Sequence, residues 1–430
     1  MPQNLTVAIR HNPSLDYTTL PRQQSDPVNP CHPKAPLDLN VGLRRDGTDG
    51  LFMYAFRPGE RSPRTTTHHA RLTVSARTVL AKAARLRSVW RDRLVHYQPS
   101  AGTADGLIGG YPFAESTDLS HHAVTSATLT TELAEEGHYL LECLLEGTDL
   151  DLCAFRDFLT GTLRDEEGLR ASFDSDLYLP WPMLAVGTVD PAAPWSAFLG
   201  HRHQIEQTGA GASYYQTIDN RLARRALPVT SLNTDSTLEF VGRAPEVRKL
   251  LEERSRLTVR TESGPLFEAL SGAVVDEDLM YFWCHGHFVE NGSPYPHLAV
   301  QLSDDRRIDA DSVLIKRRRF KAAADAQFRP FVVLNACHSG QAADGPELEH
   351  LGKALIRLGA DGVLGPQIEI PQIFATEYAY AFLDLYLSGE YTAGEITQRL
   401  VRHFVKEFHN PLALTYSLHC GIDSRLELAQ

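Results

Sequence analysis

Two stretches of the sequence decide the fold. Residues 279–288 read LMYFWCHGHF, and residues 331–340 read FVVLNACHSG. Each begins with a short apolar run, which is typical of a strand that is buried on both faces of a parallel sheet. Each run is followed by cysteine, histidine and glycine. Because active residues of such sheets gather at the carboxyl ends of neighbouring strands, the two stretches predict one site.

The predicted nucleophile is Cys337, and the predicted general base is His285. A free thiol has a pKa near ~8.5, so a nucleophilic cysteine needs an imidazole that takes its proton or holds its thiolate. Two adjacent strands about 50 residues apart would bring such a pair together, and 52 positions separate the two residues. We therefore expect thiol chemistry at this site.

The remaining residues of the two stretches have predicted supporting roles. Gly286 has no Cβ and lets a substrate approach, and its N–H and that of Cys337 could form an oxyanion hole. Alternation along an extended chain places His285 and His287 on one face and turns Cys284 into the core. His338 follows Cys337 directly and should point away from it, which makes it a poor base.

Elsewhere, short apolar strands alternate with helices. Further strands are predicted at LPVTSL and DGVLG, and one helical stripe of leucines ends at Gly359. Alternation of this kind predicts an α/β fold, a layered sheet with helices on both faces. Further helices are expected around residues 129–146, 152–164 and 396–408.

The first hundred residues have a different pattern. Period-two alternation at residues 37–43 and a second apolar run, GLFMYAF, near residue 51 predict strands of a small sheet, and Ser75 is placed to cap a following helix. The Gly- and Ser-containing stretch at 98–122 reads as a linker or long loop, which puts a boundary near residue 125.

Composition narrows the functional class. Apolar residues make up 43% of the 430 and charged residues 22%, as in globular proteins, and the net charge of −12 disfavours contact with nucleic acid. The six cysteines are irregularly spaced and predict reduced thiols. Since no run of ~18 apolar residues and no signal-like amino terminus occurs, we expect a cytoplasmic protein without membrane contact.

The ordered motifs resemble the CHAT family of caspase-like peptidases in clan CD. The resemblance rests on YFWCHGHF, FVVLNACHSG and the segment from ALIRLGADGVLG to LYLSGE, with LYLPWPML, FLGHRHQIEQ and NPLALTYSLHCG around them. It covers roughly residues 125–430. The family implies a caspase-like mixed, mostly parallel sheet flanked by helices, here preceded by a small α+β amino-terminal region.

The resemblance also implies roles for particular residues. The histidine and cysteine of the family fall on His285 and Cys337, and the S1 pocket would be lined by Asn335 and Glu369. The Glu369 carboxylate would favour a basic P1 side chain. Some relatives carry an acid before the nucleophile where this chain has neutral Asn335, which weakens a strict preference for arginine.

By the same resemblance the chain divides into three parts. Residues 1–124 form the amino-terminal region, 125–245 an inactive caspase-like half and 246–430 the catalytic half. The implied activity is cysteine endopeptidase without a cofactor or metal, acting on a protein substrate. Relatives often work with a sensor or regulatory protein in antiviral defence or cell death.

Several alternatives stay open at this stage. The chain could be a non-catalytic scaffold that binds a partner protein, or a zinc module built from Cys284, His285, His287, Cys337 and His338. The basic run at 316–319 reads as a solvated helix face or as a processing site. HRHQIEQ at 201–207 lacks the i, i+4 histidine spacing of a helical zinc site, so structural contacts are the favoured interpretation.

Overall fold

The computed structural model describes residues 36–58, 67–99, 110–209, 226–289, 297–318, 327–336 and 351–429. Two units are separated along the chain, Met1–Ala35 and Pro36–Gln430, and all described residues belong to the second. Cys337, His338 and the linker stretch 100–109 lie outside the described residues.

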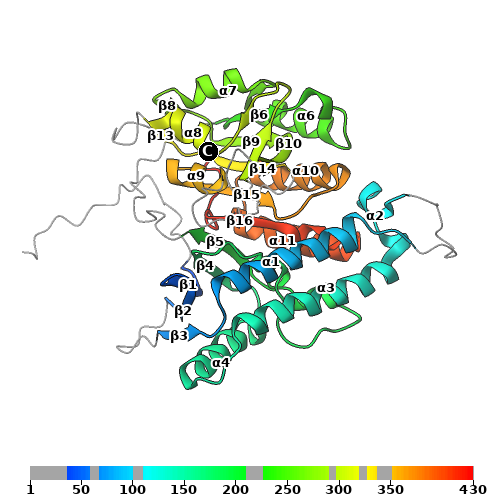
Figure 1. Ribbon diagram of the computed structural model, residues 1–430. Coiled ribbons are helices and arrows are strands. Elements are labelled where there is room, and N and C mark those ends of the chain that lie inside the picture. The colour runs from blue at the N-terminus through cyan, green and yellow to red at the C-terminus, as the bar shows by residue number, and fades with distance from the viewer. Residues whose placement is uncertain are drawn as a thin grey trace, which may run out of the picture. The chain divides into compact units, whose positions relative to one another are not determined.

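A mixed, mostly parallel sheet forms the centre of the described unit (Figure 1). Among the described residues it has eleven strands in the order β3-β2-β1-β4-β5-β16-β15-β14-β9-β6-β7. The pairs β1–β2, β2–β3 and β15–β16 are antiparallel, and the other neighbours are parallel. The strands are β1 Leu39–Asp46, β2 Gly50–Phe56, β3 His68–Leu72, β4 Arg170–Ser175, β5 Gln204–Gly209, β6 Val229–Thr234, β7 Arg256–Arg260, β9 Leu279–Trp283, β14 Phe331–Asn335, β15 Gly362–Pro366 and β16 Tyr416–His419.

Side-chain alternation separates the core into two layers, one on each face of β9 and β14. Tyr281 and Val333 belong to the larger apolar cluster, whereas Phe282 and Val332 belong to the smaller one. Strands buried on both sides therefore appear in the sequence as unbroken apolar runs, which is why they could be predicted.

Helices cover both layers. The larger cluster includes residues of α1 (Ala76–Trp90), α3 (Ala123–Leu144), α4 (Leu150–Asp165), α6 (Ala244–Arg254), α10 (Gln372–Ser388) and α11 (Ala393–Glu407). The smaller cluster includes residues of α7 (Ser263–Leu270), α8 (Ala310–Arg317) and α9 (Leu351–Leu358). The long helices α1 and α3 lie side by side, and Arg85 pairs with Glu136 between them (Figure 1). Two further helices are short, α2 (Pro112–Glu115) and α5 (Leu199–Arg202).

The amino-terminal strands join the same sheet. β1 pairs in parallel with β4, and Ser75 caps α1 by accepting a hydrogen bond from the N–H of Thr78, as predicted. The sheet also contains β6, which precedes residue 245 and pairs with β9. The fold class predicted from the sequence is confirmed, and the boundaries near residues 124 and 245 stay predictions.

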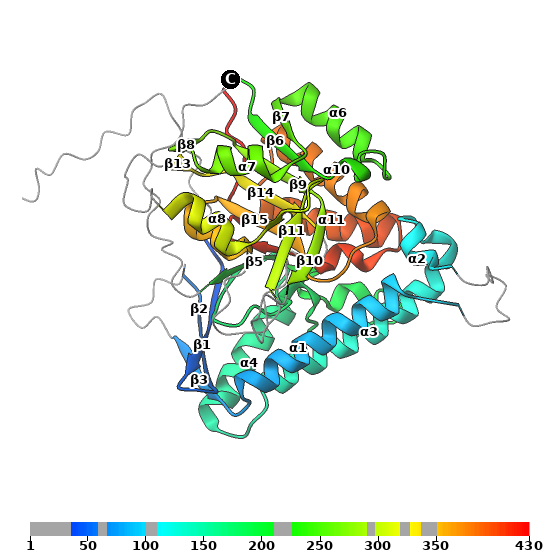
Figure 2. The same cartoon turned by 45° about the horizontal axis from the view of Figure 1, so that its top comes forward.

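Two small sheets complete the architecture. β10 (His285–Val289), β11 (His297–Gln301) and β12 (Arg307–Ile308) form an antiparallel sheet next to the carboxyl end of β9 (Figure 2). β8 (Val274–Val275) pairs with β13 (Gln327–Phe328). His285 therefore lies where the chain leaves the central sheet for the first small one.

Candidate active site

The strands that carry the two motifs are neighbours. β9 and β14 are parallel, with Leu279 opposite Phe331 and Trp283 opposite Asn335. The offset between paired residues is 52, the same as the separation of His285 and Cys337 in the sequence. Both residues follow the last residue of their strand by two positions. The predicted adjacency of the two strands is thus confirmed, and the roles of His285 and Cys337 stay predictions.

His285 begins β10, and its side chain is 41% exposed. Its Nε2 lies 3.6 Å from Oδ2 of Asp235, and its ring centroid lies 6.1 Å from that of His287. Desolvation lowers the pKa of His287, and the neighbouring His285 and Arg307 lower it further. The two histidines share one side of the chain, as the alternation predicted.

Asp235 is the residue at this site that sequence reasoning missed. It follows β6 directly, and β6 is the other parallel neighbour of β9. An acidic residue just after a predicted strand is a signal in the sequence, but the sequence does not say which strand lies beside which. The order of the sheet is what brings this carboxylate to the histidine.

Gly286 lies in β10 opposite Val300 of β11. An extended, edge-like backbone of this kind presents N–H groups in fixed directions, as an oxyanion hole requires. The second predicted donor, the N–H of Cys337, lies outside the described residues, so the hole stays a prediction.

Asn335, a predicted S1 residue, is buried and uses its polar atoms internally. Its Nδ2 donates to the carbonyl of Ala375 at 2.9 Å and to the hydroxyl of Tyr281 at 3.3 Å. Its Oδ1 accepts from the hydroxyl of Tyr416 at 2.7 Å. In this conformation Asn335 joins β14 to α10, β9 and β16.

Glu369, the other predicted S1 residue, lies three positions after β15 and is about half exposed. Its Oε2 lies 3.7 Å from Nε2 of His96, which belongs to the amino-terminal region. A surface ion pair, the more ordinary alternative for this residue, is therefore present whenever His96 is protonated. This contact does not test the S1 role of Glu369, which stays a prediction.

Cys284 lies on the other side of the sheet from His285. It is 4% exposed and belongs to the smaller apolar cluster with Met280 and Phe282. The predicted orientation into the core is confirmed. A zinc module that uses both Cys284 and His285 would need their side chains on one face, which the described backbone does not provide.

The basic run at 316–319 is partly a core feature. Arg317 ends α8, is only 2% exposed and donates to the carbonyls of Leu270 and Gly272. Arg317 therefore fits neither interpretation, a solvated helix face or a processing site, because its guanidinium is buried beside the smaller apolar cluster. Arg319 lies outside the described residues.

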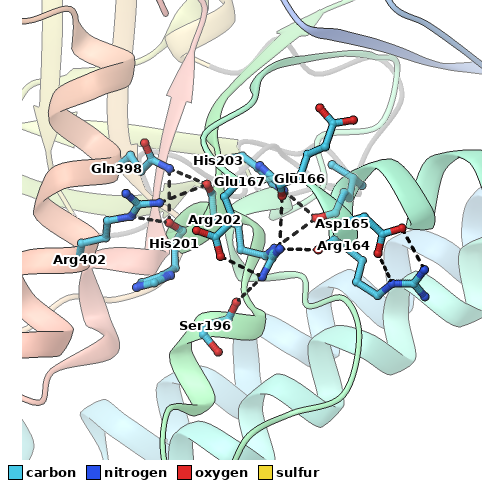
Figure 3. A network of polar contacts seen from close by, with 11 residues as sticks. Arg164, Asp165, Glu166, Glu167, Ser196, His201, Arg202, His203, Gln398 and Arg402 are labelled. Atoms are coloured by element: carbon cyan, nitrogen blue, oxygen red, sulfur yellow. Dashed lines mark hydrogen bonds and ion pairs between the residues drawn. The ribbon is translucent and has the colours of Figure 1, made fainter.

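The HRHQIEQ motif makes structural contacts between helices (Figure 3). His203 is buried, and its Nε2 lies 2.9 Å from the carbonyl of Leu163 in α4. Arg202 donates to the carbonyl of Leu163 in α4 and to that of Glu166 just after this helix. Arg402 and Gln398 of α11 donate to carbonyls of the motif. In the part of the chain that the structure describes, no group of three potential metal ligands is found.

A small cavity opens beside the carboxyl ends of β6 and β9. Leu232, Thr234 and Trp283 line it from the strands, Glu239 from the turn after the 3-10 helix that follows β6, and Arg248 from α6. Arg248 pairs with Glu239 at 3.4 Å and with Glu252 at 2.9 Å.

Over the described ranges, no helix combines the length and the apolar character that crossing a bilayer requires.

Comparisons with known proteins agree with the resemblance seen in the sequence. The family model "CHAT domain" matches residues 169–412. A protein described as a probable protease from Vitiosangium sp. is 28% identical over 138 residues, which are 32% of this chain and 17% of that protein. The chain therefore spans less than a fifth of this relative.

Among solved structures, two crystal structures of the Saccharomyces cerevisiae separase–securin complex are similar. Their TM-scores are 0.46 and 0.48 at 10% identity, with 89% of this chain and 30% of the matched chain covered. The family model covers more than half of the 430 residues and includes both strands of the candidate site, β9 and β14. The protein therefore belongs to the CHAT-domain family.

Proposed function

We propose that this protein is a cysteine endopeptidase in which Cys337 is the nucleophile and His285 the general base. The observation that supports this most is the shared register of β9 and β14. The two strands pair in parallel with an offset of 52, and the histidine and the cysteine each follow their strand by two residues. The relative described as a probable protease agrees with the proposal.

The proposed reaction proceeds in two steps. His285 takes the proton of the Cys337 thiol, and the thiolate attacks the carbonyl carbon of the substrate. The N–H groups of Gly286 and Cys337 stabilise the oxyanion, and the C–N bond breaks as the imidazolium gives its proton to the leaving amine. Water, deprotonated by His285, then hydrolyses the thioester and releases the thiol.

The proposal includes a preference for a basic P1 residue. Glu369 is exposed near the carboxyl end of β15, and a substrate cation could take the place of His96 beside its carboxylate. Asn335 would shape the pocket from within rather than bind the substrate, because its three hydrogen bonds are internal. Glu369→Gln should then weaken cleavage after Arg and Lys more than cleavage after neutral residues.

The decisive experiment removes the sulfur. Cys337→Ala should abolish cleavage of Arg- and Lys-containing peptides and labelling by a basic acyloxymethyl-ketone peptide, without lowering the unfolding temperature. Cys284→Ala is the matched control, since this thiol is buried on the opposite side of the sheet, and it should keep both properties. Cleavage by Cys337→Ala would refute the proposal. Absence of labelling in the wild type would favour the non-catalytic scaffold.

The protein substrate, a regulatory or sensor partner and a role in bacterial defence or cell death are further parts of this proposal. They rest on the resemblance alone. A comparison of new protein termini in cells that express the wild type or Cys337→Ala would identify the substrate. No new termini in cells with the wild type would count against a protein substrate.

A further inference from the structure

Asp235 presents one carboxylate oxygen to the imidazole of His285. We propose that Asp235 is a positioning residue, which holds the His285 ring with Nε2 toward the carboxylate and thereby leaves Nδ1 for the thiol of Cys337. This inference rests on the proposed function and adds a third group to it. A base that is itself oriented by a further side chain is a recurring arrangement in nucleophilic catalysis.

The carboxylate is fixed by contacts on its other side. Oδ1 of Asp235 accepts hydrogen bonds from the backbone N–H and the hydroxyl of Thr237, both at 2.9 Å. The backbone N–H of Asp235 donates to the carbonyl of Trp283 at 3.1 Å. Since Trp283 is the last residue of β9, Asp235 is tied to the same strand end that places His285. Oδ2 is the oxygen that remains for the histidine.

The loop that carries Asp235 is also held in place. Thr237 lies in a short 3-10 helix, Ser236–Leu238, and the indole N–H of Trp283 donates to the carbonyl of Leu238 at 3.0 Å. Ser236 donates through its backbone N–H to the hydroxyl of Ser303 at 2.8 Å. The position of the carboxylate therefore does not depend on its contact with His285.

Burial and charge make the contact effective. Asp235 is 8% exposed, so water screens its charge less than that of a surface carboxylate. The separation of 3.6 Å between Oδ2 and Nε2 is within the range of an ion pair and is longer than a hydrogen bond. Catalytic hydrogen bonds are often long before substrate binds and tighten in the complex.

The other charged and titratable groups near His285 are basic, whereas Asp235 is acidic. The ring of His287, in the same strand, lies with its centroid 6.1 Å from that of His285, and the positive charge of Arg307 in β12 lowers the pKa of His287. The carboxylate that the described residues bring to His285 is that of Asp235, and its negative charge should stabilise the imidazolium that forms when His285 takes the proton of the thiol.

The test removes the negative charge of Asp235 and keeps the hydrogen bonds by which its side chain caps the 3-10 helix. Asn is as good a cap as Asp, so Asp235→Asn should retain the bonds to Thr237 and the unfolding temperature. Since His285 must be neutral to take the proton of the thiol, we expect the acidic limb of the pH profile for labelling by a basic acyloxymethyl-ketone peptide to move to lower pH, with a rate at least about tenfold lower. Asp235→Glu keeps the charge and should restore part of the rate and of the position of this limb.

Asp309→Asn provides a matched control, because Asp309 caps α8 through the N–H of Ser312 in the same way but does not face His285. Its profile should equal that of the wild type. A second readout is the titration of His285 by NMR in Cys337→Ala, which should occur at lower pH when Asp235→Asn is added.

The outcomes separate this inference from the proposed function. If the wild type reacts at Cys337 and the Asp235→Asn profile superimposes on it, only the positioning role is overturned. If the wild type does not react at Cys337, both are overturned. An acidic limb at lower pH together with a lowered His285 titration supports the positioning role.

Discussion

At the scale of single residues, Asn335 allows a sharp prediction. Replacement by Asp would leave an oxygen instead of an NH₂ group facing the carbonyl of Ala375, and would bury a negative charge. Asn335→Asp should therefore lower the free energy of unfolding by about 3 kcal/mol, the cost of a lost hydrogen bond and an unsatisfied buried group. Urea denaturation at pH 7 measures this.

Asn233→Asp is the control for that change. Asn233 is equally buried, and its Nδ2 also donates to a carbonyl, that of Tyr281 at 3.5 Å. Its Oδ1, however, lies 3.5 Å from Nη1 of Arg260, a cation that also pairs with Glu277. We expect a smaller loss than at Asn335, because the guanidinium can interact with the new carboxylate as well. Equal losses at both positions would mean that the bond to Ala375 has no special importance.

The same residue scale shows what the sequence could reveal about the site. Alternation along LMYFWCHGH was enough to place Cys284 in the core and the two histidines on one side, because a strand has a fixed period. It could not reveal Asp235, whose approach to His285 depends on β6 lying beside β9. It also could not reveal that the polar atoms of Asn335 are used internally, since Tyr416 and Ala375 are distant in the chain.

At the scale of elements, the turn between α9 and β15 depends on a glycine. Gly359 ends α9 as predicted from the sequence and has a φ of +113°. A Cβ at this position would lie 2.6 Å from the carbonyl oxygen of Phe328. Gly359→Ala should thus lower the free energy of unfolding by about 3 kcal/mol, because backbone strain and a backbone clash add together.

Gly168→Ala separates those two causes. Gly168 also has a positive φ, +72°, but a Cβ there would meet nothing within 4 Å. It should cost about 1 kcal/mol, the strain alone. Thermal unfolding of the two variants side by side provides the comparison, and a loss at Gly359 no larger than at Gly168 would contradict the clash.

Elements with a clear apolar pattern could be predicted, whereas three strands with buried polar residues could not. The strands β9, β14 and β15 and the helices α1, α3, α4 and α11 follow their sequence patterns. β4, β5 and β16 were missed because they contain buried polar residues such as Ser172, Gln207 and Ser417. Such residues are tolerated where distant segments supply hydrogen bonds, as Gln367 does for Ser417.

At the scale of the whole molecule, His203 couples pH to global stability. Desolvation lowers its pKa to about 4, and the nearby Arg202 lowers it as well, although the bond to Leu163 acts in the opposite direction. The unfolded chain takes up this proton near pH 6.5. Stability should therefore fall by up to about 3 kcal/mol as pH falls from 6.5 to 4, since the unfolded state binds more protons in that range.

His203→Gln tests this prediction. The glutamine amide can still donate to the carbonyl of Leu163, but it does not titrate. The free energy of unfolding of the variant should depend less on pH between 4 and 6.5 than that of the wild type. His201 and Glu206, whose pKa values are also shifted, contribute equally to both proteins and cancel in the difference. Parallel pH profiles would exclude His203 as the source.

The strand order has a consequence for how the chain can be assembled. β16 is the last of the sheet's strands to be synthesised, yet it lies in the middle, between β5 and β15. Until residues 416–419 emerge, the strands on its two sides have no common partner and can form only two separate partial sheets with exposed inner edges. Nascent chains of this protein should therefore need protection from aggregation until late in translation.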